Sequence, residues 1–259
     1  MKNVTKILTA AVLCAALFAS TQRTDALGGA ALWPGDEANI AAFPAQVNNH
    51  AFLQLSGVGD ATDNSTGAAS LLFNNDGTSW GFNYGGAVTA DDPADWVNMS
   101  WGNGSMGVTV SMECQTNGAG DDTGSDMGVS WGSGYDWGEV GVHYATTGNG
   151  EGDATLGVNY RTGWGFWLFD NTVVGVGDLM ADDLVVNADF FTHMDAGGAD
   201  VVYGWGFDYD AGDMGGITQR ATIGVEANMT DWATLRAGYN WSYTLSSEAD
   251  DATGVNAPT

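Results

Sequence analysis

The side chains of this sequence that could do chemistry are a few ionisable residues placed at alternate positions within apolar stretches. In the stretch MGVTVSMEC, which starts at Met106, glycine, threonine, serine and Glu113 occupy every second position, and apolar residues lie between them. Strict alternation is typical of β-strands, whose successive side chains point to opposite faces. The polar face predicted in this way carries Glu113, Glu139, His143, Arg161, Asp189, Arg220, Glu226 and Arg236.

These charges have two possible roles. Rings or ladders of charge inside a pore set ion selectivity. Acids and arginines on neighbouring strands can instead form ion pairs that brace a narrow structure, because confined charges usually need partners. Arg220 and Glu226 share one strand face, and Arg236 is expected on the adjoining strand. The sequence leaves bracing and selectivity open.

Catalysis is not expected. The chain has 3 histidines, His50, His143 and His193, and the predicted strands place them at different depths, where they do not converge with a serine. Geometry comes before residue type in assigning a base. We therefore predict no catalytic residue and no enzyme, and a barrel enzyme is the minor alternative.

No metal site and no cofactor are predicted. The acidic residues of the expected loops could attract calcium, but Gln219 stands where an EF-hand beginning at Asp208 needs its final glutamate. A solvated acidic rim is the preferred interpretation of these loop acids, which are Asp91, Asp92, Asp121, Asp122, Asp182, Asp183 and Asp210.

The charge balance excludes nucleic-acid partners. From Leu27 onward only Arg161, Arg220 and Arg236 are basic, against all but one of the 32 acidic residues. Binding to phosphates requires positive charge that can displace counterions. The 2 cysteines include Cys14 in the N-terminal apolar run, so Cys114 has no internal disulfide partner.

The N-terminus predicts export. Lys2 and Lys6 precede an apolar run over Ile7–Phe18, which has the form of a secretory signal peptide and is too short to span a bilayer. We assign residues 1–26 to this signal, with cleavage between 19 and 26. Residues 27–47 form a periplasmic or plugging segment, and residues 48–245 form the β domain.

Alternation recurs throughout residues 48–245 and predicts thirteen strands. They are expected at 48–57, 68–74, 79–89, 95–101, 106–114, 127–131, 137–145, 154–161, 164–170, 184–193, 201–209, 217–229 and 232–245. Short connections, including Thr162–Gly163, alternate with mostly longer, acidic ones, including Asn171–Asp183. Bacterial transmembrane barrels have short periplasmic turns and longer extracellular loops.

The composition favours a membrane barrel over an exported soluble β domain. The polar faces hold mostly Gly, Asn, Thr and Ser with isolated charges, which suits a confined lumen. Aromatic residues such as Trp80, Trp101 and Tyr160 lie near expected strand ends, where membrane-interface girdles occur. The fold class is therefore all-β, an antiparallel transmembrane β-barrel.

An even strand number is expected for such a barrel. Thirteen strands leave residues 246–259, an acidic loop by composition, outside the cell. We therefore expect a closing strand beyond this sequence, giving fourteen strands.

The segment before the first expected strand resembles the N-terminal segment of FadL-like and PorV-like outer-membrane proteins. The matching residues are Ala26–Ala30, Asp36–Ala38 and Pro44–Ala45, with Phe43 in place of the usual Asn. The resemblance implies a fourteen-stranded, porin-like bacterial barrel, an N-terminal segment that plugs the lumen, and passage of hydrophobic molecules. The expected loops are much shorter here, so the substrate class does not carry over.

The sequence thus predicts a channel or facilitator in the cell outer membrane, surrounded by lipid and passing small solutes or ions, with the oligomeric state open. The alternatives are a structural or surface-interaction barrel without an open pore, and an exported soluble β domain.

Overall fold

A computed structural model of the chain describes residues 27–56, 68–87, 94–116, 122–146, 154–180, 184–211, 216–230 and 233–247. Three short 3-10 helices come first: η1 (Ala30–Leu32), η2 (Glu37–Ile40) and η3 (Pro44–Asn49). Thirteen strands follow: β1 (Phe52–Ser56), β2 (Ala68–Asn75), β3 (Thr78–Ala87), β4 (Ala94–Gly102), β5 (Met106–Thr116), β6 (Asp122–Tyr135), β7 (Gly138–Thr146), β8 (Ala154–Thr162), β9 (Asn171–Gly177), β10 (Val185–Asp195), β11 (Ala199–Asp210), β12 (Gly216–Thr230) and β13 (Ala233–Ser247).

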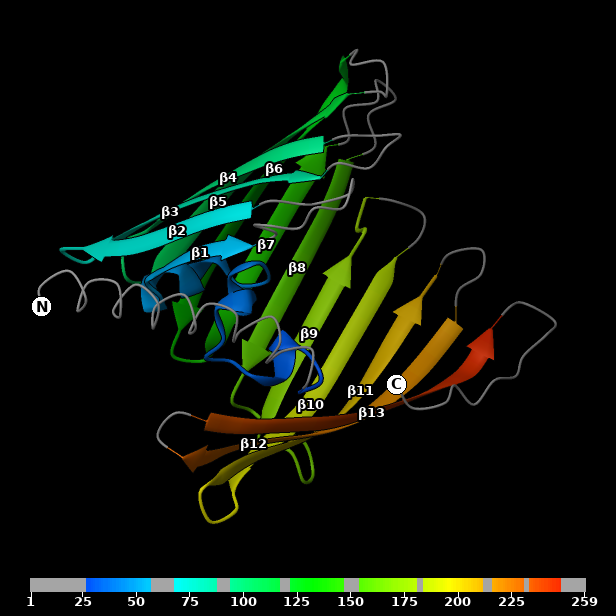
Figure 1. Ribbon diagram of the computed structural model, residues 1–259. Helices are drawn as coiled ribbons and strands as arrows, with labels where there is room; N and C mark the ends of the chain where they lie inside the picture. Colours follow the sequence, from blue (N-terminus) through cyan, green and yellow to red (C-terminus); the bar gives the residue numbers. More distant parts are fainter. Residues whose placement is uncertain are drawn as a thin grey trace, which may run out of the picture. The chain divides into compact units, whose positions relative to one another are not determined.

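The strands form one antiparallel meander sheet, in which each strand pairs with its neighbours in the sequence from β1 to β13 (Figure 1). This confirms the predicted all-β class and the number of strands. Among the described residues, no pairing joins β1 to β13. Closure into a barrel and a fourteenth strand therefore stay predictions, and the expected signal peptide lies outside the described residues.

The chain divides into two compact units. Unit 1 contains the described residues of Ile40–Gly134 and Gly141–Thr155, and unit 2 contains those of Thr21–Asn39, Tyr135–Val140 and Leu156–Thr259.

Short connections follow every second strand in most of the sheet. Asp76 and Gly77 alone join β2 to β3, both with positive φ (48° and 77°). This is the Asp-Gly hairpin turn whose twist matches that of the flanking strands. Residues 103–105 and 196–198 make two further tight connections. Most of the longer, acidic connections expected between them lie outside the described residues.

The strand predicted at 164–170 is wrong. Those residues form a connection, and the strand β9 is Asn171–Gly177. Trp167 has a positive φ of 57°, and the chain folds back so closely that a Cβ on Gly165 would overlap the backbone of Phe169. Trp164, Phe166 and Leu168 have the two-residue spacing of a strand, whereas the Val-rich segment that follows has the higher β-propensity.

Two predicted connections are wrong for the same reason. The turn Thr162–Gly163 extends to residue 170, and the loop Asn171–Asp183 is mostly strand. Other boundaries moved less: β1 begins at Phe52 rather than residue 48, because Pro44–Asn49 forms η3. Since the strand count is unchanged, every strand keeps its expected direction.

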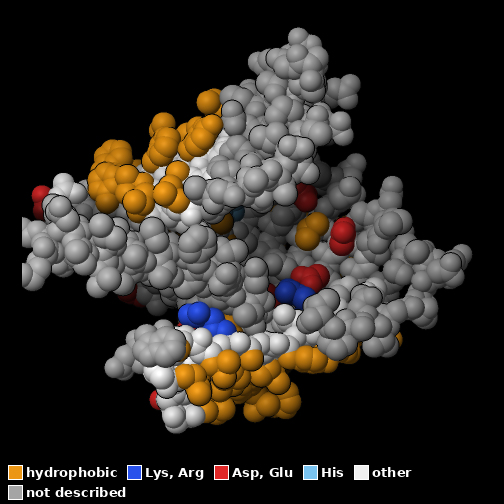
Figure 2. All heavy atoms as spheres, viewed as in Figure 1, with side chains coloured by type: hydrophobic (Ala, Val, Ile, Leu, Met, Phe, Trp, Pro, Cys, Tyr) orange, Lys and Arg blue, Asp and Glu red, His pale blue; other side chains and the backbone are white. Residues whose placement is uncertain are grey.

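The two faces of the sheet differ as the alternation predicts. Large hydrophobic side chains are exposed on one face in both units, among them Leu53, Phe82, Met99, Val129, Ile223, Leu235 and Tyr239. Figure 2 shows hydrophobic side chains along one side of β12 and β13, with arginine and carboxylate side chains on the other side of these strands. We call these the apolar face and the polar face.

The N-terminal segment, defined as Leu27–Asn49, packs on the polar face. In unit 2, Leu27 and Leu32 are buried beside Phe191 and Val202, which are two of the few large apolar residues on that face. In unit 1, Phe43, Ala45 and Val47 are buried.

Glycines of the polar face make room for this segment. A Cβ on Gly107 or Gly141 would overlap the carbonyl of Pro44 or Ala42, and one on Gly132 would lie 2.9 Å from Pro44. Glycine weakens a strand unless another backbone must approach closely. The close approach of the N-terminal segment explains the glycines at these positions.

Candidate functional site

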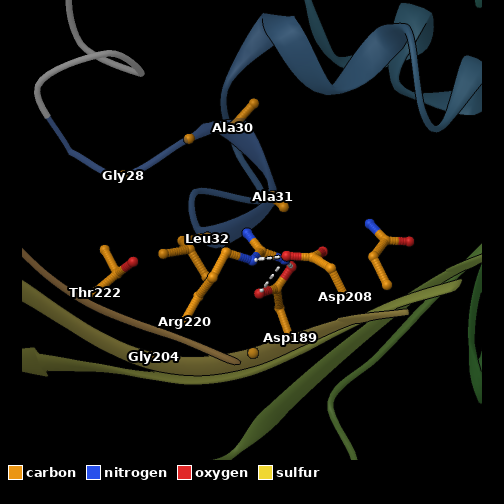
Figure 3. Close-up of a pocket in the computed structure, with 12 residues that line it drawn as sticks. Gly28, Ala30, Ala31, Leu32, Asp189, Gly204, Asp208, Arg220 and Thr222 are labelled. Atoms are coloured by element: carbon orange, nitrogen blue, oxygen red, sulfur yellow. Dashed lines mark hydrogen bonds and ion pairs between the residues drawn. The ribbon is translucent and has the colours of Figure 1, made fainter. Parts of the chain in front are cut away.

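The candidate site is the polar face, and its best-defined part is an arginine pocket in unit 2. Arg220 of β12 lies between two carboxylates, with its guanidinium 3.2 Å from Asp189 and 2.5 Å from Asp208. Figure 3 shows the Arg220 side chain reaching between both acids. The chain order of the strands explains the cluster, because β10, β11 and β12 are adjacent and Arg220 pairs in register with Gly206.

A cavity of about 280 Å³ adjoins this cluster. One wall is the stretch Gly28–Leu32 of the N-terminal segment, and the other is the polar face of β10–β12 (Figure 3). Gly204 and Gly206 contribute no side chain to that wall, and a Cβ on Gly206 would overlap the carboxylate of Asp189. The pocket therefore combines a guanidinium, two carboxylates and open space.

A second arginine joins the sheet to the N-terminal segment. Arg161 of β8 forms an ion pair of 2.6 Å with Glu139 of β7, and both side chains are nearly buried (10% and 13% exposed). Arg161 also donates a 3.3 Å hydrogen bond to the Oδ1 atom of Asn39. The amide nitrogen of Asn39 in turn donates to the carbonyl of Trp33 at 2.8 Å. This buried network holds η2 against the strands.

The third arginine makes a simpler pair. Glu226 of β12 and Arg236 of β13 are direct cross-strand partners, and Arg236 Nε donates to the Glu226 carboxylate at 2.7 Å. Both side chains are about one-quarter exposed. All three arginines that follow Leu27 are thus paired with carboxylates.

Two histidines also hold the N-terminal segment. In unit 1, His143 Nε2 donates to the carbonyl of Ala42 at 3.0 Å, and its Nδ1 lies 2.9 Å from the hydroxyl of Ser130. In unit 2, His193 Nε2 donates to the carbonyl of Leu32 at 2.7 Å. These contacts engage both ring nitrogens of His143, which makes it a structural connector.

The remaining predicted residue, Glu113 of β5, lies in unit 1, and none of the ion pairs of the three described arginines includes it. It lines a separate cavity of about 340 Å³ together with Trp96, Asn98 and Asp126. The structure therefore brings the other acids and all three arginines into three ion-pair clusters, and leaves Glu113 and His143 outside them.

Besides Asn39 of the N-terminal segment, sequence reasoning missed three charged or aromatic residues of the strands: Trp96, Asp126 and Asp208. Asp126 and Trp96 were assigned to a loop end and to a strand without a role. The alternation of side chains between the two faces could have identified all three. Each lies an even number of positions from a polar-face residue of the same strand, as Trp96 does from Ser100. A tryptophan at a polar-face position was the most distinctive signal.

No helix among the described residues is both long and apolar enough to cross a membrane. Within the same residues, no group of three or more potential metal ligands comes together.

No protein-family model, curated protein or solved structure matches this chain. The resemblance of the N-terminal segment to FadL-like and PorV-like proteins therefore stays a prediction.

Proposed function

We propose that this chain is an outer-membrane β-barrel that acts as a channel or facilitator for the passive passage of small solutes. One observation carries the proposal: large hydrophobic side chains are exposed along one face of the sheet, whereas the ion pairs lie on the other. Soluble monomers rarely expose contiguous apolar patches larger than a few hundred Å². Next to bilayer hydrocarbon, the same face carries no such cost.

Strand length agrees with this placement. Both β5 and β10 contain 11 residues. A tilted transmembrane strand needs about 9–11 residues to cross the hydrocarbon core. The tight connections at Asp76–Gly77, 103–105 and 196–198 all follow even-numbered strands, so they belong at one end of the sheet, as periplasmic turns do.

The polar face is suited to line an aqueous path. It presents glycines, small polar residues and paired charges, and the cavity beside Arg220 opens between this face and the N-terminal segment. Acids outnumber arginines on it, which favours the passage of cations over anions.

A barrel without an open pore is the second candidate, and the packing of the N-terminal segment favours it. Leu27 and Phe43 are almost completely buried, and the buried network around Arg161 and Asn39 fixes the segment further. For the channel to conduct, a path must remain beside this segment, or the segment must move.

Planar-bilayer recording separates the two candidates. The full chain is refolded in detergent, its folding is checked by the shift in gel mobility between unheated and boiled samples, and it is added to a bilayer in KCl. The channel predicts discrete conductance steps. A folded but silent protein would support the sealed barrel, and a folded protein that stays monomeric in buffer without detergent would support the soluble β domain.

A further inference from the structure

The arginine pocket of unit 2 presents charges of both signs to one cavity of about 280 Å³. The charged and polar side chains that line it are those of Asn187, Asp189, Asp208, Arg220 and Thr222 (Figure 3). Pockets for drug-sized ligands have volumes of about 300–1,000 Å³, so this cavity suits a smaller solute.

One nitrogen of the Arg220 guanidinium donates no hydrogen bond to any described residue. The Nη2 atom donates to Asp208 at 2.9 Å and to Asp189 at 3.4 Å, and Nε lies 2.5 Å from a carboxylate oxygen of Asp208. An arginine carries five N–H donors in a fixed plane. The two N–H groups of Nη1 therefore remain available to an acceptor in the cavity.

The side-chain amide of Asn187 is a second polar group of the cavity without a hydrogen-bond partner in the described part of the chain. The residue is partly buried on β10. Its Oδ1 atom lies against the cross-strand partner Gly175 of β9, where a Cβ would overlap it. An amide offers two donors and one acceptor. A polar ligand in the cavity would supply the partners that the described residues do not.

The acids are placed beside the arginine by the register of three strands. Asp189 of β10, Gly206 of β11 and Arg220 of β12 form one cross-strand row. A Cβ on Gly206 would overlap the Asp189 carboxylate, so the glycine lets the acid and the arginine meet. A carboxylate has about four lone-pair sites. Contacts with Arg220 occupy only part of these sites, and the others can accept hydrogen bonds from an ammonium group.

A ligand with charge of only one sign matches this pocket poorly. A simple anion would meet Asp189 and Asp208, and a simple cation, metal ions included, would meet a guanidinium that is always charged. A zwitterion matches both signs, because its carboxylate can accept from Nη1 of Arg220 while its ammonium group donates to the acids. Hydrogen bonds between charged groups are roughly twice as strong as those between neutral groups.

We propose that the arginine pocket is a binding site for a small zwitterion of the α-amino acid class. The ligand carboxylate lies against Arg220 and the Asn187 amide, and its ammonium group lies against Asp189 and Asp208. The inference names a solute class for the proposed channel, and it rests on the proposed function only for the passage of the bound solute. Binding itself depends on the pocket of unit 2 alone.

The first test compares three ligands of similar size on the full, detergent-folded chain by ligand-observed NMR in mildly acidic buffer. They are alanine, lactate, in which a hydroxyl replaces the ammonium group, and alaninamide, in which a neutral amide replaces the carboxylate. We expect alanine to bind at least about tenfold more tightly than either, because each comparison ligand loses one hydrogen bond between charged groups. Equal binding of alanine and either comparison ligand, or no binding of alanine, would overturn the proposal.

The variant Arg220→Gln separates recognition of the ligand from support of the pocket. It should weaken alanine binding at least about tenfold without weakening alaninamide binding, because only the ligand carboxylate loses its partner. A purely structural arginine would instead cause the same loss for both ligands, and that result would contradict the assignment.

Gly206→Ala tests the pocket without changing any charge. The new methyl group displaces the Asp189 carboxylate and should weaken alanine binding. The matched control is Asp136→Asn, an exposed acid in the β6–β7 turn, which should bind alanine as the parent chain does. Unchanged alanine binding in both Arg220→Gln and Gly206→Ala would overturn the placement of the site.

Uptake of alanine into liposomes that contain the folded chain tests passage, with protein-free liposomes as the control. Binding without uptake refutes the channel for this solute and leaves the site standing. Uptake without saturable binding refutes the site and leaves the channel standing.

Discussion

The two units build the same kind of two-faced sheet, but they treat charge on the polar face differently. Unit 2 contains all three arginines that the structure describes, and each is paired with one or two carboxylates. Unit 1 has no lysine or arginine in its described part, and its acids Glu113 and Asp126 face each other across two strands. The paired charges of unit 2 favour a bracing role, whereas Glu113 and Asp126 of unit 1 line a cavity of about 340 Å³.

The N-terminal segment shows the same contrast on a smaller scale. In unit 2 it is held by side chains with strong polar contacts, namely Arg161 and His193. In unit 1 it lies directly on glycines such as Gly107 and Gly132, with His143 as an additional hydrogen-bonding partner. One attachment depends on charge and the other on close backbone packing, so different substitutions should break them.

The largest effect is expected from Arg161→Met in unit 2. The change leaves Glu139 nearly buried without its cation and removes the bond to Asn39. Removing one partner of a buried ion pair costs about 3–5 kcal/mol. Urea unfolding followed by gel mobility measures this loss. The double variant Arg161→Met with Glu139→Met should recover most of it, and a double variant as unstable as the single one would contradict the bracing role.

Gly107→Ala tests the attachment in unit 1. The added Cβ would overlap the carbonyl of Pro44, so the strand or the N-terminal segment must shift. Overpacking of this kind costs about 1–3 kcal/mol. If the segment shifts, the conductance should rise and a protease should cut the segment faster. Gly134→Ala is the matched control, because nothing lies within 4 Å of a Cβ at that glycine.

Arg220→Gln tests the role of the arginine pocket in unit 2. It removes the cation between Asp189 and Asp208 and leaves two acids in a cavity of about 280 Å³. We expect the reversal potential in a KCl gradient to shift toward that of a more cation-selective pore. An unchanged reversal potential would mean that ions do not pass this cavity.

The smallest effect is expected from Glu226→Gln. Its pair with Arg236 is about one-quarter exposed, and pairs of this kind contribute about 0–1 kcal/mol. Bracing predicts a slight loss of stability and an unchanged ion preference in bilayer recordings. A marked change of ion preference would assign this pair to selectivity instead.

The alternation of side chains sufficed to predict the number of strands, the approximate positions of all but the ninth, and their two faces. It failed at residues 164–170, where apolar residues recur at every second position from Trp164 but a tight turn at Gly165 and Trp167 brings the backbone back on itself. The alternation of neighbouring side chains does not reveal such a contact, because the contact joins backbone groups several positions apart.

The candidate site was only partly predictable. Alternation placed the eight ionisable residues on one face, and the pair Glu226–Arg236 follows from the short connection that the predicted strands 217–229 and 232–245 leave between them. The pairing of Arg220 with Asp208 required the register of β11 against β12. Predicting the roles of Asn39 and of the polar-face glycines would have required the path of the N-terminal segment. The sequence of that segment has no periodicity from which the path could be predicted.

The central claim is that the apolar face contacts lipid and the polar face contacts water. Asn98 and Met99 are adjacent residues of β4; Asn98 lines the unit 1 cavity, and Met99 is 60% exposed on the apolar face. A spin label is attached at Asn98→Cys or Met99→Cys in a chain whose own 2 cysteines are replaced by alanine, and the folded protein is placed in liposomes. The account predicts that oxygen dissolved in the lipid relaxes the label at position 99, and that a water-soluble nickel complex relaxes the label at position 98. Relaxation of both labels by nickel alone, or the reverse assignment, would contradict it.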